Sequence, residues 1–130
     1  MTRPAYRWLD RRIARPGPYL TLCLSEAEFY SALDKINIRD RPAWVNPGAD
    51  ATTHHMSNPK NELVSVVCLQ GWEQRSGNEI AGLLVHEAVH VWQEYALVMG
   101  EHAPGREQEA YAIQAVAQEL MAEFARRCVK

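Results

Sequence analysis

The chain has 130 residues, of which 47% are apolar and 23% charged, and its formal net charge is −2. This length suits one domain with its own core, and the slightly negative charge argues against a nucleic-acid-binding surface. No run approaches the roughly 18 apolar residues of a membrane span, so no membrane association is expected.

The cysteines and the first residues indicate the compartment. Cys23, Cys68 and Cys128 are odd in number and widely spaced, which predicts free, buried thiols and neither a disulfide framework nor a zinc knuckle. The first residues also lack the apolar core of a secretory signal. A cytoplasmic location is therefore expected.

Residues 1–18 are rich in arginine and proline. We expect a basic lead-in here, with a possible short helix over residues 5–14. Its arginines would either be solvated or meet a phosphate-rich or acidic partner, and a solvated surface is the more common outcome. Residues 19–130 are expected to form a single domain.

Residues 19–69 predict three strands and one helix. Residues 19–24 suit a strand, and Ser25 with Glu28 forms a capping-box pattern that should open a helix to about Ile36. A short extended piece is expected at residues 43–46. Residues 50–57 and the apolar residues 63–69 should form a hairpin around a four-residue turn at 58–61.

Two helices are predicted in the remainder of the chain. Ser76 and Glu79 form a second capping box, opening a helix that runs to about Met99 with Gly100 as its cap. This helix is apolar around most of its circumference, so it should be central. A last helix should run from Arg106 or Glu107 to about residue 127, with an apolar stripe at Ala110, Ile113, Ala117, Leu120, Met121, Phe124 and Cys128. The order of elements predicts an α+β domain with a small antiparallel or mixed sheet against helices.

The first of these helices carries the sequence His86-Glu87-Ala88-Val89-His90. Histidines four residues apart on a helix project from one face, at the spacing needed to hold one metal ion, and zinc accepts imidazole nitrogen readily. Glu87 can reach a water on that ion as a general base. A lone buried histidine is more often a satisfied core residue. Burying two imidazoles and a carboxylate on this helix would, however, require partners, and zinc is one.

This run resembles the HExxH helix of the zincin metallopeptidases. The following Val91-Trp92-Gln93 resembles small bacterial and phage-type metallopeptidases, and Glu107-Gln108-Glu109-Ala110-Tyr111 is similar to the E-x-x-A segment of gluzincins. The resemblance covers mainly residues 76–128. It implies a zinc-dependent peptidase in which His86, His90 and a later glutamate bind Zn²⁺. Glu87 would then activate a water molecule for attack on a peptide bond.

The third ligand and the oxyanion-binding group stay open. Glu107 matches the first glutamate of the segment and is preferred as the metal ligand, with Glu109 the alternative and His102 a distant third. Tyr111, Tyr95 and His102 are candidates to stabilise the oxyanion, since they lie in or near the two helices. Tyr111 is the one we assign a catalytic role.

Residues 50–57 have a possible role in substrate binding. In zincins an edge strand beside the active-site helix receives the substrate in extended form. Neighbouring strand residues point to opposite faces, so either His54 or His55 could face the cleft, or the segment could be an ordinary surface hairpin.

Three functions are compatible with these patterns. The leading one is a minimal zinc metallopeptidase acting on a peptide or protein. The alternative is an inactive zinc-stabilised binding or assembly module, for example of a phage or mobile element. In the third, the histidines are coincidental in a helical partner-binding domain. The oligomeric state is not indicated.

Overall fold

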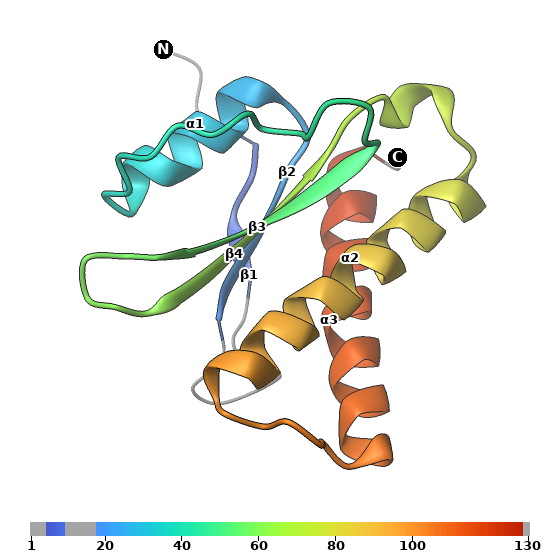
Figure 1. The fold of residues 1–130 in the computed structure, drawn as a ribbon. Helices are drawn as coiled ribbons and strands as arrows, with labels where there is room; N and C mark the ends of the chain where they lie inside the picture. The colour runs from blue at the N-terminus through green and yellow to red at the C-terminus, as the bar shows by residue number, and fades with distance from the viewer. Residues whose placement is uncertain (1–4, 10–17, 129–130) are drawn as a thin grey trace.

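A four-stranded mixed sheet forms the middle of the fold, with helices on both faces (Figure 1). The computed structural model describes residues 5–9 and 18–128. The strands are β1 (Trp8–Leu9), β2 (Tyr19–Cys23), β3 (Ala51–Ser57) and β4 (Leu63–Leu69), in the order β1-β2-β4-β3. β2 runs parallel to β4, whereas the other two pairs are antiparallel. The predicted α+β class with a small mixed sheet is confirmed.

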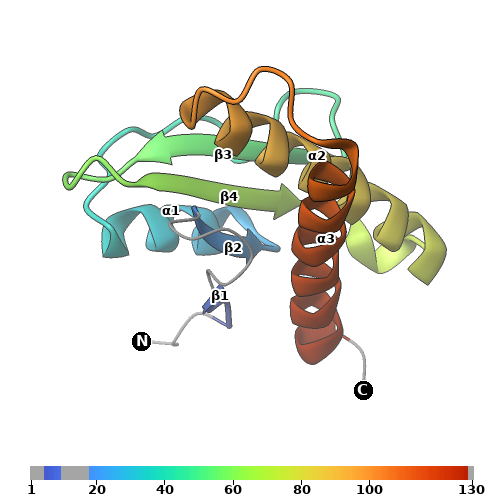
Figure 2. The same ribbon diagram turned by 90° about the horizontal axis from the view of Figure 1, so that it is seen from below.

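Helices α1 (Glu26–Lys35), α2 (Gly77–Val98) and α3 (Arg106–Cys128), together with a short 3₁₀ turn at Trp72–Gln74, complete the described part. α1 covers one face of the sheet, and α2 and α3 cover the other (Figures 1 and 2). Both predicted N-caps are confirmed. Ser76 and Glu79 form the full reciprocal capping box. Ser25 caps α1, but the carboxylate of Glu28 accepts from the backbone N–H of Leu24.

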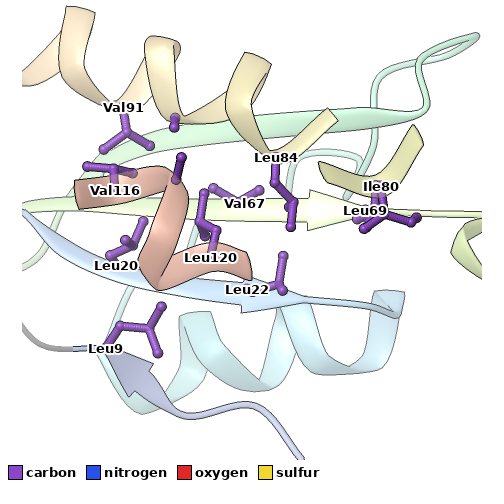
Figure 3. Packing of buried hydrophobic residues seen from close by; sticks show 12 residues of the cluster. Leu9, Leu20, Leu22, Val67, Leu69, Ile80, Leu84, Val91, Val116 and Leu120 are labelled. Atoms are coloured by element: carbon purple, nitrogen blue, oxygen red, sulfur yellow. The ribbon is translucent and has the colours of Figure 1, made fainter. Parts of the chain in front are cut away.

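The alternation of side chains along the strands separates two cores. Val64, Val66 and Cys68 of β4 pack on the α1 side. Val67 and Leu69 face α2 and α3, in the packing that Figure 3 shows. The α2 and α3 side of the core consists of Leu9, Leu20, Leu22, Val67, Leu69, Ile80, Leu84, Ala88, Val91, Val116, Ala117 and Leu120. A strand residue's position, odd or even, therefore decides which helices it meets.

Two local predictions are wrong. The described start of the expected helix at 5–14 is extended: Trp8 and Leu9 pair with β2, since pairing satisfies their backbone groups and buries Leu9, and residues 10–14 lie outside the described residues. The extended piece expected at residues 43–46 is not formed: the chain bends at Trp44 and Val45, and the backbone N–H of Asn46 donates to the Thr52 hydroxyl.

The buried face of α3 is rotated relative to the predicted stripe. Ala117 and Leu120 are buried as expected, but Ala110 is exposed. Val116 and Glu123 are buried in its place. Arg7, which precedes β1, and Arg126 of α3 both donate hydrogen bonds to the carboxylate of Glu123. These bonds allow a charged residue to be buried at a position outside the predicted apolar stripe.

The described cysteines are free thiols. Cys23 and Cys68 are buried side by side on β2 and β4, and Cys128 is partly buried. Burial raises the pKa of the Cys68 thiol, so it stays protonated. In the described ranges, no helix has both the length and the apolar character needed to cross a membrane.

Candidate functional site

His86 and His90 project together from the exposed face of α2. Their Nε2 atoms lie 3.2 Å apart. Two imidazole nitrogens bound to one tetrahedral zinc ion, at the usual zinc–nitrogen distances, are separated by about 3.3 Å. The separation of the two Nε2 atoms is therefore close to that of two histidines that share a zinc ion.

The other ring nitrogen of His90 has its own partner. Its Nδ1 lies 3.2 Å from the Oε1 of Gln93, an acceptor when the ring nitrogen carries the proton. That tautomer leaves the Nε2 lone pair of His90 free, either for a metal ion or for an N–H of His86. An outer hydrogen bond that selects the tautomer in this way is typical of metal-binding histidines.

The histidine pair is open to solvent, contrary to the expectation that the whole motif is buried. The side chain of His86 is 68% exposed. Burial therefore imposes no cost on these two rings, and their solvation alone would satisfy them. Glu87 is the buried member of the motif, only 4% exposed.

Glu87 has two oxygens in different surroundings. Its Oε1 accepts a hydrogen bond of 2.8 Å from the hydroxyl of Thr53 on β3. Its Oε2 lies 3.9 Å from the Nε2 of His86 and receives no hydrogen bond from the described residues. Among the described residues, the only buried side-chain nitrogen or oxygen without a hydrogen-bond partner is Arg127 Nε, so solvent reaches Oε2 of Glu87. An accessible carboxylate oxygen beside His86 can accept a hydrogen bond from water or meet a cation.

The register of β3 decides which of its histidines lies near the motif. Thr53 and His55 face α2, because they stand opposite Val67 and Ser65 of β4. His54 points to the other face, where its ring stacks on Phe29. Of the two predicted alternatives, His54 and His55, it is therefore His55 that lies on the same side of the sheet as the histidine pair of α2.

His55 is held in place by the sheet. Its Nδ1 lies 3.2 Å from the hydroxyl of Ser65. Burial lowers the pKa of His55 below its ordinary value; Glu94 opposes the shift and His90 adds to it. The ring is therefore predominantly neutral near pH 7.

The acidic candidates on α3 occupy different surroundings. Glu109 accepts a 2.8 Å hydrogen bond from the indole N–H of Trp92. Trp92 follows His90 by two residues, about 200° around the helix, so Glu109 is engaged on another side of α2. Glu107 is exposed and makes no bond with the described residues. Within residues 5–9 and 18–128, no three His, Cys, Asp or Glu side chains are arranged to hold a metal ion, so Glu107 as third ligand stays a prediction.

The three oxyanion candidates are not gathered at the histidine pair by any described contact. Tyr111 is 66% exposed on α3. Tyr95 is buried in a small cluster with Trp92, where it packs between α2 and α3. His102 is exposed in the turn before α3. A catalytic role for Tyr111 stays a prediction.

Thr53 and Gln93 are the site residues that sequence reasoning missed. Gln93 could have been found, because it follows His90 by three residues and so shares its helix face. Thr53 could have been found only once β3 was placed beside α2. Its parity with His55 on the strand would then have assigned both to the same face.

A scan against protein-family models, a search of curated proteins and a search of solved structures each returned no match to this chain. Function is therefore inferred from the chain's own residues and their geometry.

Proposed function

We propose that the protein is a zinc-dependent hydrolase that cleaves peptide bonds. The observation that carries this proposal is the pair of Nε2 atoms 3.2 Å apart on the open face of α2, beside the buried carboxylate of Glu87. His86 and His90 would hold the ion. Glu107 is the expected third ligand, because Glu109 already bonds Trp92.

In the proposed reaction, Glu87 would act as the general base beside the metal ion. A bound zinc ion supplies a Lewis acid that polarises the substrate carbonyl and makes water acidic enough to lose a proton near neutral pH. With such an ion bound, Glu87 would accept that proton at Oε2, the oxygen without a hydrogen-bond donor. It would later return the proton to the amine that leaves when the carbon–nitrogen bond breaks.

The position of β3 supports an extended peptide or protein as the substrate. β3 is an edge strand that pairs only with β4 among the described strands. Its free backbone groups can pair with an extended chain, as in other cases of strand addition. The same strand contacts Glu87 through Thr53, so a peptide bound along it would lie beside the histidine pair. We place the protein in the cytoplasm, where its cysteines would stay reduced.

Zinc titration of the purified protein tests the metal site. We expect one zinc ion per chain by calorimetry and elemental analysis, and a loss of binding in His86→Ala and in His90→Ala. Glu107→Ala should weaken zinc binding. Glu101→Ala is the matched control, because Glu101 is also an exposed glutamate but lies in the loop before α3, and it should leave zinc binding unchanged. Binding that is unchanged in both histidine variants would refute the metal site.

Cleavage assays then separate catalysis from the alternative. The zinc-loaded protein should hydrolyse members of a broad peptide library, and a chelator should stop it. One bound zinc without cleavage of any peptide would instead indicate a zinc-stabilised binding or assembly module. The presence of the buried Glu87 next to His86 favours catalysis, because a purely structural site has no use for a base.

A further inference from the structure

The hydrogen bond between Thr53 and Glu87 fixes the orientation of the carboxylate. The Thr53 hydroxyl lies 2.8 Å from Oε1, while Oε2 lies on the side of His86. A hydroxyl has one proton to donate, so the Thr53 proton is committed to Glu87. The terminal torsion of a glutamate is broad and roughly two-fold in the absence of such a contact. The bond thus selects one orientation of the carboxylate plane.

Thr53 is itself held firmly. It stands in the middle of β3, opposite the fully buried Val67 of β4. As a β-branched residue in a paired strand, it has few side-chain conformations available. Thr52 and His54, its neighbours, point to the α1 side and cannot replace it.

We propose that Thr53 is a positioning residue that holds Glu87 with Oε2 directed at the histidine pair. This inference rests on the proposed hydrolytic function. Among the described bonds, the Thr53 hydroxyl is bonded to Glu87 and to neither histidine, so it acts through Glu87 and leaves metal binding unchanged. Its loss frees the carboxylate to rotate, which lowers the fraction of molecules with a base aimed at the attacking water.

Three variants of β3 test this role. Thr53→Val keeps the shape and removes the donor, and Thr53→Ser keeps the donor. Thr52→Val is the matched control: it removes the hydroxyl of the neighbouring β3 threonine, which accepts one hydrogen bond from the backbone N–H of Asn46 on the opposite face. The measurements are kcat, KM and zinc affinity, together with crystal structures of the metal-free variants.

We expect Thr53→Val to lower kcat by about tenfold to a hundredfold, the range of one hydrogen bond to a charged group. KM and zinc affinity should stay unchanged, since the bond serves the chemical step and not binding. Thr53→Ser should restore kcat, and Thr52→Val should not alter it. In metal-free crystals of Thr53→Val, the carboxylate of Glu87 should rotate away from His86.

The outcomes separate this inference from the proposed function. If the wild-type protein binds zinc but cleaves no peptide, the proposed peptidase function is wrong. The orientation of Glu87 in the metal-free crystals then still shows whether Thr53 holds the carboxylate in place. An active wild type together with a Thr53→Val variant of equal kcat defeats the role of Thr53. An unmoved Glu87 in the Thr53→Val crystals does so as well.

Discussion

Two buried glutamates, Glu87 on α2 and Glu123 on α3, show how differently this fold treats the same side chain. Glu123 is completely buried and is met by two arginines, Arg7 at 2.9 Å and Arg126 at 2.7 Å. Glu87 is 4% exposed and has one neutral donor, the Thr53 hydroxyl. No lysine or arginine of the described residues bonds Glu87.

The difference indicates what each carboxylate does. A buried charge is costly unless it is paired, and Glu123 is paired within the fold. Glu123 lies on α3, and its bond with Arg7 joins the described N-terminal residues to this helix. Arg126, one turn further along α3, donates to the same carboxylate. Glu87 keeps one oxygen available beside His86, an arrangement that a structural role does not need. We therefore expect opposite responses when each is changed to the neutral isostere glutamine.

The largest expected effect is on catalysis. Glu87→Gln should lower kcat by about 10²–10⁴-fold, the usual contribution of a general base, while one zinc ion per chain stays bound. Peptide hydrolysis and elemental analysis of the same preparation measure both. Glu123→Gln, assayed per folded molecule, is the control and should keep its kcat. Equal losses of kcat in Glu87→Gln and Glu123→Gln would show that the two carboxylates do not differ in their catalytic role.

The next effect is on stability. Glu123→Gln should lower the free energy of unfolding by about 1–2 kcal/mol near neutral pH, since it weakens charge-assisted hydrogen bonds whose arginines remain partly in water. Urea denaturation measures this loss, and Gln118→Glu at an exposed α3 position is a charge-changing control. A variant as stable as the wild type would show that the two ion pairs contribute nothing net.

The same carboxyl predicts a pH dependence. Burial by itself raises the pKa of Glu123, but hydrogen bonds from Arg126 and Arg7 outweigh it and lower the pKa below the ordinary value of 4.5. The folded protein thus binds this proton less tightly than the unfolded chain does. The contribution of Glu123 is present above that ordinary value and is lost as the pH falls through the lowered pKa. The stability difference between wild type and Glu123→Gln should shrink accordingly.

The smallest effect is the most diagnostic. In metal-free protein, Glu87→Gln should leave the free energy of unfolding within about 1 kcal/mol of wild type, or raise it, because it removes a buried charge without a cation. Gln can still accept the Thr53 hydrogen bond at its Oε1. Urea denaturation in the presence of a chelator measures this. A loss as large as that of Glu123→Gln would mean that Glu87 is charge-stabilised by the fold itself.

Local signals in the chain were sufficient for the regular elements. Ser76 and Glu79 marked the start of α2, and the apolar run at residues 63–69 marked β4. Propensity failed at Trp8 and Leu9, where pairing with β2 made a strand from a segment without a strand pattern. It failed again at Glu123, where Arg126 and the distant Arg7 compensate a buried charge. In both places a partner in another segment of the chain decides the outcome.

The sequence by itself determined the α+β class and the face that His86 and His90 share, because the helical repeat alone brings residues four apart together. Only the tertiary structure decided that the histidines are exposed while Glu87 is buried. It also decided that His55 and not His54 stands on their side of the sheet, and that Thr53 meets the carboxylate. Those facts depend on the register of β3 against β4 and on the packing of α2 over it. Both are set by contacts between segments that no local pattern records.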